Sequence, residues 1–241
     1  MVKNKPVYSF EEADSKKRML LGGKGAGLSE MTRLKLPVPV GFTITTEVCT
    51  KYYDNNKKLP KDVMPAVMKN IAKMEKKTGK KWNSIKNPLL VSVRSGAATS
   101  MPGMMDTILN LGLNEKTVEG LAEQTKNPRF SWDSYRRFIQ LFGKVVFGVK
   151  DEKFDYILDE VKKKQGIQDD SKLNVESLKT IVLEYKKICE KHTKRKFPDT
   201  PDEQLVLAIE AVFKSWMGER AIVYREKNNI TKDIANGTAV N

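Results

Sequence analysis

The pattern of apolar residues changes near Asn114, and this change constrains the fold more than any other feature. From there to about residue 200 the chain reads as nearly continuous helix. Apolar side chains recur at three- and four-residue spacing, as expected for one face of a long amphipathic helix. Its members are Trp132, Tyr135, Phe138, Ile139, Phe142, Val145 and Val146. We interpret this aromatic stripe as core packing rather than as a slot for a cofactor.

The first third of the chain alternates between short strands and helices instead. Residues 40–44, 88–94 and 106–111 are predicted strands, and residues 27–35, 47–53 and 63–77 are predicted helices. Residues 197–204 contain two prolines and are predicted to be a linker. The fold class is therefore α+β, with three parts: a mixed lobe over 1–112, a helical insert over 113–200, and a return segment over 201–241.

Composition and targeting signals narrow the class of protein. The 241 residues are 39% hydrophobic and 31% charged, which is typical of a folded soluble chain. No apolar run approaches the roughly 20 residues that span a bilayer, and the N-terminus resembles no secretory signal. The two cysteines, Cys49 and Cys189, lie far apart without metal-ligand spacing. These observations predict a cytoplasmic protein without a membrane partner.

The net charge of +14 favours polyanionic partners, and nucleic acid is the first candidate. The two densest lysine runs, 76–81 and 191–196, are expected at helix ends or in loops and contain no interleaved aromatic residues. Cations at such places suit the helix dipole without any ligand. We therefore expect no nucleic acid partner, although a non-catalytic basic binding module remains an alternative.

Residues 22–27 read Gly-Gly-Lys-Gly-Ala-Gly and precede a predicted helix. Glycines allow the backbone to approach a ligand closely, and a helix N-terminus attracts anions. Lys24 adds a mobile positive charge suited to phosphate. The segment matches neither the Walker A pattern nor G-x-G-x-x-G. The residues alone leave a plain turn and a phosphate cradle equally open.

A second candidate stretch, VSVRSGAATS, follows at residues 91–100. Arg94 lies at the predicted end of a strand, where its guanidinium could present a planar fork to phosphate oxygens; a buried ion pair is the alternative. In the next stretch, MPGMMDT, three methionines surround a Pro-Gly pair at 102–103. This stretch could form a mobile apolar lid over a flat base, or the methionines could simply fill gaps in a core.

Taken together, these blocks resemble a known family. GGKGAGLSEM, PVPVGFTIT, VSVRSGAATSMPGMMDTILNLGL, SYRRFIQLFGKVVFGV and SWMGERAIVYREKNNI are similar, in order, to the N-terminal nucleotide-binding domain of the pyruvate, phosphate dikinases. The phosphoenolpyruvate synthases share the GGK and VRS blocks but do not usually carry MPGMMDT. They, and related dikinases, remain the alternative.

The resemblance implies the first lobe of an ATP-grasp-like fold with a helical insert subdomain. In the family, the lysine of the GGK block and the arginine of the VRS block hold the ATP phosphates, which implies catalytic roles for Lys24 and Arg94. The resemblance also implies that the glycine of the MPGMMDT loop belongs to a lid over the polyphosphate and that the second methionine after it lines the base pocket. The residues assigned to nucleotide binding are Gly22, Gly23, Lys24, Gly25, Arg94, Gly103 and Met105.

The family reaction converts ATP, phosphate and pyruvate to AMP, pyrophosphate and phosphoenolpyruvate through a phosphohistidine on a separate domain. The one histidine, His192, lies in the lysine-rich run 191–196 and is not expected to be that carrier. The resemblance also implies Mg²⁺, with its ligands outside this chain, and the remaining dikinase domains as partners. We therefore expect a monomeric part of the enzyme that binds nucleotide weakly and lacks complete turnover by itself.

Overall fold

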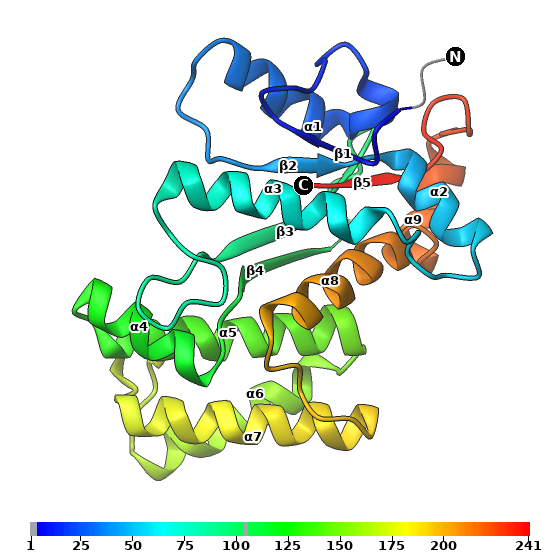
Figure 1. Ribbon diagram of the computed structural model, residues 1–241. Helices are drawn as coiled ribbons and strands as arrows, with labels where there is room; N and C mark the ends of the chain where they lie inside the picture. Colours follow the sequence, from blue (N-terminus) through cyan, green and yellow to red (C-terminus); the bar gives the residue numbers. More distant parts are fainter. Residues whose placement is uncertain (1–3, 104–105) are drawn as a thin grey trace. The chain divides into compact units, whose positions relative to one another are not determined.

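The chain folds into two units (Figure 1). The computed structural model describes residues 4–103 and 106–241. By their contacts, residues up to 79, 93–107 and 209–241 form unit 1, and residues 80–92 and 108–208 form unit 2. The three-part domain division expected from the sequence stays a prediction, and the contacts group residues 80–92 with the helical residues that follow.

A five-stranded sheet joins segments that lie far apart in the sequence. Its order is β1-β2-β5-β3-β4. In unit 1 the pairs β1·β2, β2·β5 and β5·β3 are antiparallel, with Val7 opposite Ile44 and Gly96 opposite Ala239. The strands are β1 (Val7–Ser9), β2 (Phe42–Ile44), β3 (Val91–Ala97), β4 (Thr107–Leu111) and β5 (Thr238–Val240).

The helices of unit 1 bury one apolar face each. In α3, for example, Val67 and Ile71 are four residues apart and are almost fully buried. The helix ends at Gly79, which takes the left-handed conformation common just after a helix. The helices are α1 (Arg18–Arg33), α2 (Thr46–Asp54), α3 (Val63–Thr78) and α9 (Glu219–Lys227), and α8 (Pro201–Ser215) enters the unit at Ile209.

Unit 2 consists mainly of helices, as predicted from the apolar stripe. Phe138 and Phe142 of α5 both contact Phe197, with ring centroids 6.2 and 5.4 Å apart, so the stripe forms a core. An asparagine caps the N-terminus of each of α4, α5 and α7, where its side-chain oxygen accepts a hydrogen bond from a backbone N–H of the first turn. The elements are α4 (Glu115–Thr125), α5 (Pro128–Phe147), α6 (Asp151–Lys164), the 3₁₀ turn η1 (Asp170–Lys172) and α7 (Val175–Thr193).

The α+β class is confirmed, and several boundaries differ from those predicted, of which three are instructive. The helix expected from residue 27 begins at Arg18. The strand expected to end at Arg94 continues to Ala97, because Ser95, Gly96 and Ala97 pair with β5. The linker expected to extend to residue 204 ends at Pro201, which begins α8; proline suits the first turn of a helix because no intrahelical partner is needed there. In the part of the chain that is described, every helix is too short or too polar to cross a bilayer.

Candidate functional site

The glycine-rich segment forms the start of the regular part of α1. Gly22 leaves helical geometry, with φ 71° and ψ 164°, and separates one short turn from the helical run that follows. Lys24 therefore lies in the first turn after the break. Backbone N–H groups in such a turn lack intrahelical acceptors, and the helix dipole there favours negative charge. The local backbone is suited to an anion.

The glycines also have a packing role that the sequence did not reveal. A Cβ atom on Gly22 would lie 1.9 Å from the carbonyl oxygen of Gly96. A Cβ atom on Gly25 would lie 2.7 Å from Oγ1 of Thr43 and 2.8 Å from Oδ1 of Asn241. Real Cβ atoms do not approach so closely, so Gly22 and Gly25 allow α1 to lie against the sheet. Gly23 has more room, its nearest neighbour being Nη2 of Arg18 at 3.1 Å.

Lys24 and Arg94 are brought together by this packing. Nζ of Lys24 donates a hydrogen bond to the carbonyl oxygen of Ser95 at 2.8 Å, so the lysine side chain follows β3. Burial, and to a lesser extent the positive charge of Arg94, lower the pKa of Lys24. Because Arg94 acts on Lys24 electrostatically, the two side chains lie near each other, and that they bind phosphate together stays a prediction.

Arg94 is held in place by its backbone. Its N–H donates to the carbonyl oxygen of Asn241, and its own carbonyl oxygen accepts from the N–H of Asn241, both at 2.8 Å. Val93 and Ser95 are buried while Arg94 is exposed, as strand alternation requires. The ion pairs found among the described residues include neither Arg94 nor Lys24. The alternative of a buried ion pair for Arg94 is therefore wrong.

Two like charges that lie near each other repel, and an anion between them would reduce that repulsion. A polyphosphate carries several negative charges and many acceptor oxygens, and it suits both a lysine point charge and an arginine fork. That the start of α1 and β3 form such an anion site stays a prediction.

The predicted lid residue Gly103 follows the buried Met101 in a turn. Its φ is 72°, a value that glycine adopts without strain, and apart from its chain neighbours no described residue has an atom within 4 Å of the position a Cβ would take. Nothing packed around it therefore requires a glycine; only its backbone conformation does. Met105, predicted to line the base pocket, lies outside the described residues.

Arg18 is a third cation that sequence reasoning missed. Its Nε donates to the carbonyl oxygen of Ala98 at 2.8 Å, and its Nη2 would lie 3.1 Å from a Cβ on Gly23. It thus ties the turn before Gly22 to the residues that follow β3. In the sequence, Arg18 is only an arginine four residues before the glycine segment. Such a pattern is too common to predict a role for the residue.

No group of three or more His, Cys, Asp and Glu side chains that could hold a metal ion occurs within residues 4–103 and 106–241. The expectation that Mg²⁺ ligands come from elsewhere stays a prediction.

The fold defines an α+β module in which Lys24 and Arg94 lie near each other beside a glycine-rich helix start. Residues 18–58 and 55–241 match the family model described as pyruvate phosphate dikinase, AMP/ATP-binding domain, and the chain belongs to this family.

Relatives named pyruvate, phosphate dikinase are similar over nearly the whole chain. The protein from Entamoeba histolytica is 53% identical over 97% of this chain and 26% of its own length. The protein from Clostridium symbiosum is 49% identical over 98% of the chain and 27% of its length. The protein from Giardia intestinalis is 48% identical, with the same two coverages. The chain therefore spans about a quarter of the length of these relatives.

Proposed function

We propose that this chain binds ATP and acts as the nucleotide-binding part of a pyruvate, phosphate dikinase. Such an enzyme converts ATP, phosphate and pyruvate to AMP, pyrophosphate and phosphoenolpyruvate. The observation that carries the proposal is that Lys24, at the start of α1, lies near Arg94 of β3. The chain that contains them belongs to the AMP/ATP-binding family. The dikinase names of the relatives favour this enzyme over phosphoenolpyruvate synthase.

Each residue of the site has a role in this proposal. Lys24 and Arg94 bind the phosphate oxygens, and Gly22, Gly23 and Gly25 let the start of α1 approach them. Gly103 lies in a lid that closes over the polyphosphate. Phosphoryl transfer depends mainly on positioning and on neutralising the phosphate oxygens, and these side chains can do both. Mg²⁺, when bound, would neutralise further oxygens.

The finer architecture belongs to the same proposal. We assign 1–112 to the first lobe of an ATP-grasp-like fold, 113–200 to a helical insert subdomain and 201–241 to the segment that returns to the lobe. The phosphohistidine domain, the site for pyruvate and the Mg²⁺ ligands would be supplied by other parts of a dikinase. A monomeric state and a cytoplasmic location complete the proposal.

Calorimetric titration with ATP tests the site directly. We expect Lys24→Met and Arg94→Met each to weaken ATP binding about 10- to 100-fold, because a hydrogen bond to a charged group contributes about 1.5–3 kcal/mol. Lys51→Met in α2 and Arg220→Met in α9 remove equal charges from exposed positions elsewhere and should leave the affinity within about twofold.

Equal losses in all four variants would show that only net charge matters and would contradict the proposed site. A titration with a short DNA duplex at two salt concentrations tests the alternative of a basic binding module. Binding by phosphate contacts would weaken steeply with salt. We expect no duplex binding at physiological salt.

A further inference from the structure

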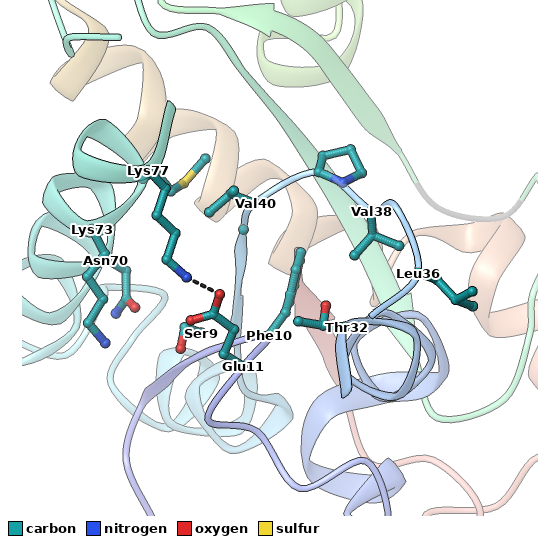
Figure 2. A pocket seen from close by; sticks show the side chains of 13 residues that line it. Ser9, Phe10, Glu11, Thr32, Leu36, Val38, Val40, Asn70, Lys73 and Lys77 are labelled. Carbon is teal, nitrogen blue, oxygen red and sulfur yellow. Dashed lines mark hydrogen bonds and ion pairs between the residues drawn. The ribbon is translucent and has the colours of Figure 1, made fainter. Parts of the chain in front are cut away.

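Unit 1 contains a pocket that the proposed function does not use (Figure 2). It lies among the segment after β1, the C-terminal part of α1, the loop that follows α1, and α3. The volume comparable with that of a closed cavity is about 110 Å³, and one side of the pocket is open to solvent. Thr32 is the residue of α1 that lines the pocket. It comes eight residues after Lys24, a distance of about 12 Å along a helix. The pocket is therefore distinct from the candidate phosphate site.

Apolar side chains form much of the wall, and a buried amide lies among them. Asn70 is 5% exposed. Its Nδ2 donates to the carbonyl oxygen of Ala66 at 2.9 Å, which fixes the orientation of the amide. Its buried Oδ1 accepts no hydrogen bond from any described residue. The apolar lining residues are Phe10, Leu36, Val38, Pro39, Val40 and Met74.

An acceptor buried without a donor costs about 1–3 kcal/mol. A ligand that brings an O–H or N–H group to Oδ1 of Asn70 would recover that free energy. The pocket therefore favours a molecule with an apolar body and one hydrogen-bond donor.

The rim of the pocket carries two lysines, each paired with a carboxylate. Lys73 and Lys77, one helical turn apart on α3, both line it, whereas Glu11 is the one acidic side chain among the lining residues. Lys77 forms an ion pair with Glu11, which Figure 2 shows, and Nζ of Lys73 lies 3.5 Å from a carboxylate oxygen of Glu12. Ion pairs this exposed contribute little, so a ligand carboxylate can replace one of them.

We propose that this pocket binds a small aromatic carboxylic acid that carries a hydroxyl or amino donor, of the hydroxybenzoate class. The ring packs against Phe10 and Met74, whose sulfur is a favourable neighbour for an aromatic ring. The donor binds Oδ1 of Asn70, and the carboxylate binds Lys73 or Lys77.

Calorimetry and protein NMR with four probes test the proposal. The probes are 3-hydroxybenzoate, 4-hydroxybenzoate, benzoate, which lacks the donor, and 4-hydroxybenzyl alcohol, which lacks the charge. We expect one of the hydroxybenzoates to bind at least fivefold more tightly than benzoate and than the alcohol. Asn70→Leu should remove the advantage over benzoate, and Lys73→Gln with Lys77→Gln should remove the advantage over the alcohol.

Matched controls come from the same helix. Lys69 and Lys76 are exposed on α3 and do not line the pocket, so replacing both by Gln should leave all four affinities within about twofold. Val40→Phe, at a half-exposed position of the wall, fills the pocket without touching the amide and should abolish binding even if Asn70→Leu fails to fold. Lys24→Met should not change hydroxybenzoate binding, so this test is independent of the ATP proposal.

No binding of either hydroxybenzoate at millimolar concentration would overturn the proposal. So would binding that Val40→Phe and Asn70→Leu leave unchanged, or resonance shifts that map to residues outside the pocket. Equal affinity for hydroxybenzoate and benzoate would show that Asn70 serves water rather than a ligand donor, and would also overturn it.

Discussion

Gly22 and Gly96 approach each other so closely that a Cβ atom on Gly22 would lie 1.9 Å from the carbonyl oxygen of Gly96. This contact places the start of α1 directly against β3. Lys24, two residues later, can therefore reach the carbonyl oxygen of Ser95, the residue next to Arg94. The glycine segment is both a packing element and one side of the candidate anion site.

The first prediction concerns Gly22. Gly22→Ala should lower the free energy of unfolding of unit 1 by at least about 2 kcal/mol, because the new methyl group overlaps a backbone atom and the position has a positive φ. Urea-induced unfolding measures the change. Gly27→Ala in the same helix is the matched control, since no described atom beyond its chain neighbours and the nearby helix backbone lies within 4 Å of its Cβ position.

We expect Gly27→Ala to be neutral or to stabilise the protein by up to about 1 kcal/mol, because alanine favours helix more than glycine does. If both variants lost the same stability, the close approach of Gly22 to Gly96 would not be what makes glycine necessary there.

The second prediction tests the lid. Gly103→Val should weaken ATP binding at least fivefold, because valine resists the left-handed backbone conformation at φ 72°. Gly79→Val is the matched control: it has φ 70° and also no neighbour within 4 Å of its Cβ position, but it follows α3. Calorimetry with ATP compares the two. A similar loss of ATP affinity in both variants would remove the lid assignment from Gly103.

Sequence patterns predicted the helices well wherever a local apolar stripe exists. Residues 63–77 were expected to be helical, and α3 covers Val63–Thr78. Local spacing decides such cases, because an amphipathic helix shows its buried face within a few turns. The strands around residues 42–44 and 107–111 were also predicted, from alternation and bounding turn residues.

Features that depend on distant partners could not be predicted. Ser95, Gly96 and Ala97 look like a polar loop, yet they pair with Thr238, Ala239 and Val240, more than 140 residues later. The crowding at Gly22 and Gly25 depends on the same distant pairing. Lys24 and Arg94 were predicted to share a site only because the family resemblance linked them, since no local pattern connects residues 70 positions apart.

The third prediction concerns a buried ion pair in unit 2. Arg136, whose side chain is 5% exposed, lies 2.6 Å from the carboxylate of Asp133, and the exposed Arg137 also pairs with Asp133, at 2.9 Å. Arg136→Met leaves Asp133 with one partner and should cost about 1–2 kcal/mol of unfolding free energy. Asp133→Asn leaves a buried guanidinium whose nearest carboxylate, that of Asp170, is 3.8 Å away, and should cost about 3 kcal/mol.

Urea-induced unfolding of both variants measures this order. A loss from Arg136→Met equal to or greater than that from Asp133→Asn would show that Arg137 does not compensate for Arg136. Arg137→Met provides the control and should cost less than about 1 kcal/mol, because its side chain is 66% exposed.

The fourth prediction concerns the pH dependence of ATP binding. Burial and Arg94 lower the pKa of Lys24, so its charge is lost as pH rises through a value below the usual one. ATP favours the charged lysine, so binding should take up a proton. The affinity should fall by up to tenfold per pH unit once the pH exceeds that lowered value.

Calorimetry between pH 7.5 and 10 measures the slope, since phosphate groups are already ionised there. Lys24→Arg keeps its charge throughout this range and should bind ATP with little pH dependence. An equally steep slope in Lys24→Arg would show that another group titrates and that Lys24 does not contact the phosphates.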